Sequence, residues 1–166
     1  MDSSSAPVTV PNPTGLVHAI TVTALVAGTL DYAAAITNYL LNGGREPIRI
    51  AWYIASSLLP RETAYGGGWA TAAFGVGVHY ALATAWTVLF FFGYPRVALL
   101  RRSPALVSVI YGAFVWAMMN QVLVPLTRIT PGPFNLTAAA TAAAILMVCI
   151  GLPNALLARR HFAQTT

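Results

Sequence analysis

The chain has 166 residues, of which 57% are hydrophobic and 8% are charged, and its formal net charge is +5. Water-soluble domains contain about 25% charged residues, so this composition excludes a water-soluble fold. The positive charge comes from arginines that lie between apolar segments and form no dense basic run, which argues against a nucleic-acid partner. Such a placement is typical of residues that flank membrane spans.

Residues 1–14 are polar and proline-rich and contain no Arg or Lys, which predicts a flexible tail rather than a cleavable signal peptide. Residues 15–160 contain four continuous apolar runs, each longer than the roughly 20 residues that a helix needs to cross a bilayer. The predicted spans are residues 16–41, 69–92, 105–126 and 136–157, followed by a C-terminal tail at residues 161–166. The predicted fold class is therefore all-α, a polytopic membrane protein with a four-helix transmembrane bundle.

A shorter helix is predicted at residues 48–59, between the first and second spans. Pro47 suits the first helical position and Glu46 suits the positive end of the helix dipole. The segment is too short to span a bilayer, so we expect an interfacial or re-entrant amphipathic helix, with a packed surface helix as the alternative. The glycine-rich residues 65–69 that follow predict a flexible turn.

The arginines indicate an orientation. Five of them belong to the second connection and the C-terminus, which share a membrane side with the N-terminus: Arg96, Arg101, Arg102, Arg159 and Arg160. The four on the opposite side, Arg45, Arg49, Arg61 and Arg128, are offset by Glu46 and Glu62. This bias predicts that both termini are cytoplasmic.

Asp31 and His79 are the most informative candidate functional residues. Asp31 lies within the first span on a face of small residues that also carries Asn38, and His79 lies on a similar face of the second span. Each is ten residues from the same membrane side, or about 15 Å at the rise of a helix. If the two spans pack face to face, the carboxylate and the imidazole meet and form a proton-accepting pair.

Asn120 and Gln121 of the third span lie near that same membrane side and are candidates to extend this polar site. The alternative is structural, because intramembrane Asp, His, Asn and Gln side chains also hydrogen-bond neighbouring helices. His79 with His18 or Met118 is a weaker candidate for haem ligation. No catalytic motif is present, and the single cysteine, Cys149, forms no paired redox or zinc motif, so no enzyme activity, cofactor or metal is predicted.

Residues 79–131 carry a recognisable order of features. His79 is followed by an aromatic run into Tyr94-Pro95, then by a span containing Gly112, and then by Pro125-Leu126-Thr127-Arg128-Ile129-Thr130-Pro131. This order resembles the YagU-like family of uncharacterised bacterial inner-membrane proteins. The resemblance implies a bacterial inner-membrane location and a helical bundle, and it supplies no activity.

Together these patterns predict an integral membrane protein that assists transport or proton and ion handling through the Asp31–His79 site. The alternative is a structural accessory subunit of a larger membrane complex. The expected partners are the lipid bilayer and either further copies of the chain or other membrane subunits, because four short helices barely enclose a solute pathway.

Overall fold

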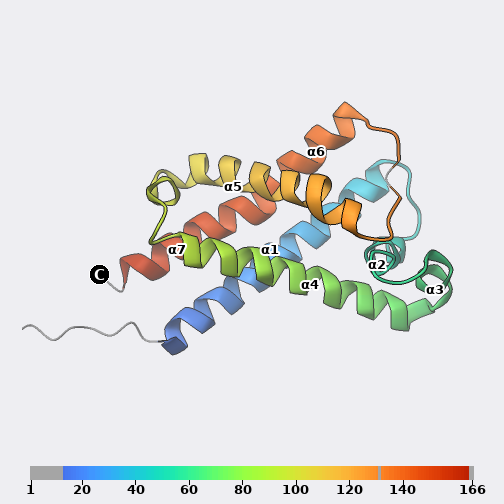
Figure 1. The fold of residues 1–166 in the computed structure, drawn as a ribbon, viewed down its shortest axis with the longest axis horizontal. Coiled ribbons are helices and arrows are strands. Elements are labelled where there is room, and N and C mark those ends of the chain that lie inside the picture. Colours follow the sequence, from blue (N-terminus) through green and yellow to red (C-terminus); the bar gives the residue numbers. More distant parts are fainter. Residues whose placement is uncertain (1–12, 131, 165–166) are drawn as a thin grey trace, which may run out of the picture.

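The computed structural model describes residues 13–130 and 132–164, and most of these are helical, with no strand among them. Four long helical segments run back and forth along the molecule (Figure 1): α1 (Pro13–Leu41), α4 (Gly68–Gly93), α5 (Pro104–Met118) with its continuation, and α6 (Leu136–Leu146) with its continuation. The prediction of an all-α four-helix bundle is confirmed.

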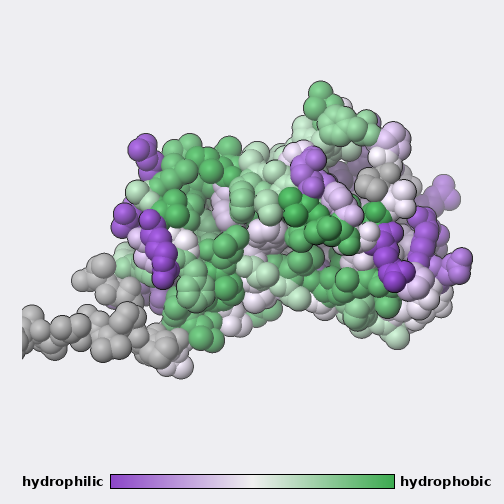
Figure 2. Space-filling model, viewed as in Figure 1, coloured by the Kyte–Doolittle hydropathy of each residue, from purple (hydrophilic) through white to green (hydrophobic). Residues whose placement is uncertain are grey.

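The four segments have the length and apolarity of membrane spans: Thr14–Leu41, Gly68–Gly93, Pro104–Leu126 and Leu136–Ala163. Hydrophobic side chains cover the middle of the visible face, and hydrophilic ones gather mostly toward its two ends (Figure 2). The first and last described residues lie at the same end (Figure 1). The chain is therefore a multi-pass membrane protein. We call the end with residues 13 and 164 the terminal end, and the other the α2 end.

Short helices complete the two ends. They are α2 (Ile48–Ala55) and α3 (Arg61–Gly66) at the α2 end, and the 3-10 helix η1 (Ala98–Arg101) at the terminal end. The predicted helix at 48–59 stops at Ala55, because Ser56 and Ser57 turn their hydroxyls back onto the carbonyls of the last turn. Pro60 also disfavours a helical conformation in the residue before it.

The expected flexible turn at residues 65–69 is wrong. Tyr65 and Gly66 belong to α3, and a tight link through Gly67 leads into α4 at Gly68. Gly68 has a φ of +59°, a backbone conformation that only glycine adopts without strain. Glycine therefore joins two helices here.

The outer boundaries of the first and last spans also differ from the prediction. The predicted tail at 1–14 lies outside the described residues except for 13 and 14, which are already in α1. Helix α7 (Leu152–Ala163) includes residues 161–163 of the predicted C-terminal tail. Its Phe162 ring stacks on Tyr94, with ring centroids 4.9 Å apart. An aromatic contact thus extends the last helix beyond the predicted span.

The hydrophobic core lies mainly in the half of the bundle nearer the terminal end. Phe90, Phe91 and Tyr94 of α4 are buried there against Tyr111 of α5. Ala155 and Ala158 of α7 complete the contact from the fourth span. This half is therefore closed by packed aromatic side chains.

Helix α2 packs closely across the first half of α4. A Cβ atom placed on Gly75 would lie 2.0 Å from the carbonyl oxygen of Ala51, so only glycine allows this approach. The Trp52 indole donates a hydrogen bond to the Gly68 carbonyl (2.8 Å), and the Arg128 N–H donates to the Ser57 carbonyl (3.1 Å). These contacts hold α2 against the second span and join the turn after α2 to the loop that follows the third span.

Two π-helical turns interrupt the third and fourth spans. They are η2 (Met119–Leu123), which leads into the 3-10 turn η3 (Val124–Leu126), and η4 (Met147–Gly151), which joins α6 to α7. Each is followed by a proline, Pro125 or Pro153, which has no N–H to continue the α-helical hydrogen bonds. The two spans touch at η4, where the Ser108 hydroxyl donates to the Met147 carbonyl.

Candidate functional site

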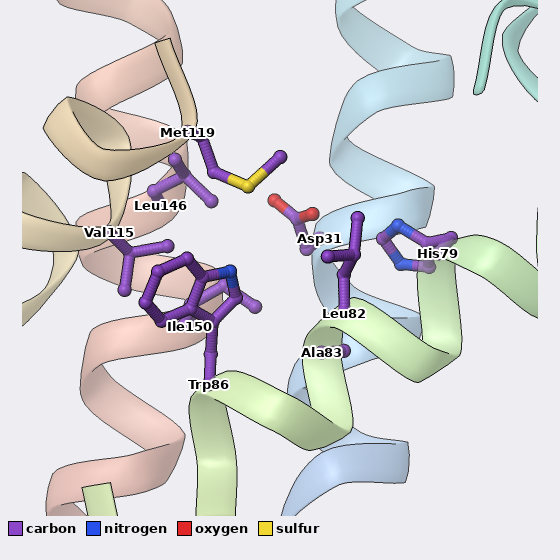
Figure 3. Close-up of a pocket in the computed structure, with 9 residues that line it drawn as sticks. All are labelled: Asp31, His79, Leu82, Ala83, Trp86, Val115, Met119, Leu146 and Ile150. Atoms are coloured by element: carbon purple, nitrogen blue, oxygen red, sulfur yellow. The ribbon is translucent and has the colours of Figure 1, made fainter. Parts of the chain in front are cut away.

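Asp31 lines a small cavity in the interior of the bundle. The cavity has a volume of about 60 Å³ and is walled by apolar side chains of α4, α5, η2 and the fourth span around Asp31 and His79 (Figure 3). The carboxylate points into this space beneath Met119 (Figure 3). Among the described residues, none donates a hydrogen bond to it. Asp31 is thus a half-buried acid that faces a cavity instead of a protein partner.

His79 lines the same cavity but is bound elsewhere. Its Nε2 lies 2.8 Å from the Gly28 carbonyl oxygen, and because a carbonyl only accepts, Nε2 carries the hydrogen and donates. Nδ1 of the neutral ring is then the free acceptor. The Tyr32 ring lies beside the imidazole, with centroids 5.2 Å apart. The histidine therefore has a fixed tautomer and orientation.

The direct Asp31–His79 pair is not formed. No ring nitrogen of His79 lies within 4.0 Å of an Asp31 carboxylate oxygen. The imidazole instead donates its hydrogen bond to the carbonyl of Gly28, which lies in α1 like Asp31. The two side chains line one cavity, but a gap separates them. A small polar species fits between such groups, since one water needs roughly 10–15 Å³ of this kind of volume.

Trp86 adds a polar atom that was not predicted. Its indole N–H is buried and has no hydrogen-bond partner, and the nitrogen faces the cavity on the side of Asp31 (Figure 3). The Tyr111 hydroxyl donates to the Trp86 carbonyl, which anchors this turn of α4. The cavity therefore offers a carboxylate and an N–H donor to the same small volume.

A larger open cleft leads from the α2 end of the bundle to Asp31. Its volume is about 730 Å³, and it lies among α1, α2, η2 and α6, with Asp31, His79, Met119 and Leu146 common to it and to the inner cavity. Polar side chains line much of it: Tyr32, Asn38, Tyr39, Asn42, Tyr53, Asn120, Asn135, Thr137 and Thr141. The cleft thus connects a membrane-embedded acid to one end of the molecule.

The other predicted site residues divide between this cleft and the surface. Asn38 and Asn120 line the cleft, where Asn38 accepts a hydrogen bond from Asn42 (3.1 Å) and Asn120 donates one to the Trp116 carbonyl (2.9 Å). Gln121 is exposed and lines neither cavity. The prediction that Gln121 extends the site is wrong, because the π-helical turn that contains it shifts the phase of the helix and leaves its side chain exposed.

The weaker haem assignment also lacks support from geometry. Neither His18 nor Met118 lines a cavity with His79. In the part of the chain that the structure describes, no group of three or more His, Cys, Asp or Glu side chains gathers at one point. What the arrangement offers chemically is one carboxylate, one imidazole acceptor and one indole donor at the end of a polar cleft.

Several lining residues were missed from the sequence. Asn42 continues the spacing of Asp31, Ala35 and Asn38 along one helical face, so this signal was available. Tyr53 reaches the cleft from α2 and Trp86 reaches the cavity from α4, and both depend on how separate helices pack. No family model, curated protein or solved structure matches the chain.

Proposed function

We propose that this membrane protein assists the transport of protons or monovalent cations, with Asp31 as the membrane-embedded binding group. The observation that carries the proposal is the open cleft, lined in part by polar side chains, that ends at this carboxylate. Asp31 is ten residues from the end of α1 at Leu41, about 15 Å by helical rise. Protons and small cations are the species that such a carboxylate binds without any further acidic ligand.

Energetics support a functional role for Asp31. An aspartate near the middle of a membrane helix costs about 2.5–3.5 kcal/mol on insertion scales. A purely structural acid offsets that cost with hydrogen bonds to neighbouring helices, yet no described residue donates one to Asp31. Water or a cation in the cleft and the inner cavity is the remaining source of compensation.

His79 gives the site a second proton acceptor. Its Nε2–H is committed to Gly28, so an arriving proton binds at Nδ1 and converts the ring to an imidazolium. A proton held at Asp31 or at Nδ1 can pass between them through water in the shared cavity. The Trp86 N–H is buried beside this cavity without a partner, and we propose that it donates to such water when the side chain moves toward it.

Complete transport requires movement, because the half of the bundle nearer the terminal end is filled by the aromatic core. The π-helical turn η4 borders both the cavity and that core through Ile150. Its hydrogen bonds are already interrupted before Pro153, which makes it the part of the fourth span that bends most easily. We propose that bending at η4 opens the second half of the pathway.

Proton flux into liposomes tests this function. With wild-type protein, an imposed membrane potential should drive protons across the bilayer and change the internal pH of the vesicles. Asp31→Asn should lose most of that proton flux. Glu62→Gln is the matched control, since it removes the same charge from an exposed position in α3. Equal flux in wild type and Asp31→Asn would remove the transport proposal.

A second candidate function is that of an accessory subunit in a larger membrane complex. It is favoured by the fourth span, of which only 17% is buried within the chain, compared with 22–28% for the other three. Helix α6 has no buried residue, so its surface is free for another membrane protein. Purification from mild detergent without any cross-linked partner would count against this function.

The location that we propose is a bacterial inner membrane with both termini in the cytoplasm. The excess of arginine at the terminal end supports that orientation. In this orientation the cleft opens at the outer face of the membrane.

A further inference from the structure

The charge balance of the cleft selects for positive ligands. Among the described residues that line it, Asp31 is the one acid, His79 is the one base, and no arginine is present. Asn38, Asn42, Asn120 and Asn135 contribute amides, which offer oxygen atoms to a cation without adding charge. With Asp31 ionised and His79 neutral, the cleft carries a single negative charge at its inner end.

Aromatic rings cover the path to that charge. Tyr32 and Tyr39 of α1, Tyr53 of α2 and Trp116 of α5 all line the cleft. The faces of such rings attract organic cations, and they also pack against apolar substituents. A molecule in the cleft therefore meets aromatic side chains from three separate helices.

The position of Tyr39 is fixed by the chain itself. A Cβ atom added to Gly44 would lie within 2.3–2.5 Å of three carbon atoms of the Tyr39 ring, so the glycine backbone lies directly against that ring. Asn42 holds the same turn by donating to the Asn38 carbonyl (2.7 Å). A fixed ring presents its face to a ligand at a low cost in conformational entropy.

The size of the cleft exceeds what a proton or an inorganic ion requires. Ligand sites for organic molecules typically measure about 300–1,000 Å³, and this cleft measures about 730 Å³. Its walls combine the polar groups named above with Ile50, Ile54 and Ala142. Such a mixture suits a molecule that has both a charge and an apolar body.

We propose that the cleft binds a monovalent organic cation with aromatic or bulky apolar substituents, whose charge lies near Asp31 and whose substituents lie among the four rings. This inference rests on the proposed function, because it names the substrate class of the same site. It differs from proton conduction in requiring the outer cleft as well as the inner cavity.

Two ions of matched shape and opposite charge test the proposal directly. Tetraphenylphosphonium and tetraphenylborate are titrated into the purified full-length protein in a neutral detergent, and binding is measured by equilibrium dialysis against protein-free micelles. We expect saturable binding of the phosphonium and only micelle partitioning of the borate. Asp31→Asn should weaken phosphonium binding about thirtyfold or more, as expected when a charge loses a desolvated partner.

Two further variants separate recognition from misfolding. Asp31→Glu keeps the charge and should restore most of the affinity that Asp31→Asn loses. Tyr53→Leu keeps an apolar side chain at an exposed ring position in α2 and should weaken binding about threefold or more, which corresponds to the loss of one cation–π contact. Equal binding of both probes, or unchanged phosphonium affinity in both Asp31→Asn and Tyr53→Leu, would overturn the proposal.

The result of the phosphonium binding measurement is independent of the result of the proton flux measurement. Flux that depends on Asp31, together with no phosphonium binding, would leave proton transport standing and reject the organic cation. Phosphonium binding that depends on Asp31, in a protein without proton flux, would support the cation site and reject proton transport.

Discussion

The close packing of α2 on α4 makes Gly75 the most sensitive glycine for the shape of the cleft. In Gly75→Ala the new Cβ would lie 2.0 Å from the Ala51 carbonyl oxygen and 2.9 Å from its carbonyl carbon. Backbone atoms cannot rotate away as a side chain can, so α2 has to move off α4. Overpacking of this kind typically costs about 1–3 kcal/mol.

Gly77→Ala is the matched control, because it lies in the same helix and nothing approaches its added Cβ within 4 Å. Alanine stabilises a helix by about 1 kcal/mol relative to glycine. That gain is common to both variants and cancels in the comparison. Gly75→Ala should therefore be less stable than Gly77→Ala by about 1–3 kcal/mol.

Reversible unfolding in mixed micelles with increasing dodecyl sulfate, followed by circular dichroism, measures the difference in the free energy of unfolding. Because Tyr53 lines the cleft from α2, Gly75→Ala should also weaken phosphonium binding while Gly77→Ala leaves it unchanged. Equal stability and equal binding in the two variants would refute the packing of α2 against α4.

Three further predictions address single interactions. Ser108→Ala removes the hydroxyl that donates to the Met147 carbonyl and should lower the free energy of unfolding by about 1 kcal/mol in the same titration; no loss would mean that this contact between α5 and η4 is absent. Partial desolvation of the half-exposed Tyr53 ring, with a smaller contribution from Tyr65, raises the pKa of Tyr53 above its ordinary value of 10.0, so the folded state holds the phenol proton more tightly than the unfolded chain. The contribution of the Tyr53 phenol to the free energy of unfolding is complete below pH 10.0 and is lost as the pH rises through the raised pKa. Tyr53→Phe should flatten this decrease in unfolding titrations at alkaline pH, and an unchanged pH profile would contradict the partial burial of Tyr53. Trp86→Phe removes the unpaired indole N–H and should reduce proton flux while changing stability by less than about 1 kcal/mol, because no protein hydrogen bond is lost; unaltered flux would exclude the indole from the pathway.

The number of spans and the distance of Asp31 from the end of its helix could be predicted from the sequence because each follows from one helix at a time. A continuous apolar run fixes a span, and the count of residues from its end fixes that distance. The helical conformation of the segment after Pro47 could also be predicted. The residue at which this helix ends depends on the combined effect of Ser56, Ser57 and Pro60.

The partners of the site residues could not be predicted in the same way. Helix α4 is apolar on every side, so its sequence does not specify which face meets α1. His79 therefore shares a cavity with Asp31 while its hydrogen bond goes to Gly28. Asn120 and Gln121 illustrate the same difficulty at a π-helical turn, where the phase of the helix shifts.

Access of water to residue 31 from one membrane side tests the central claim most directly. Asp31→Cys in a Cys149→Ala background is reconstituted into vesicles and treated with a membrane-impermeant thiol reagent added to either side. Glu62→Cys, at an exposed position of α3, marks the α2 end, and Gln164→Cys marks the terminal end. Labelling of position 31 from the same side as Glu62→Cys, and from that side alone, is the expected result. Protection from both sides, or labelling from the side of Gln164→Cys, would contradict a cleft that opens at the α2 end and reaches Asp31.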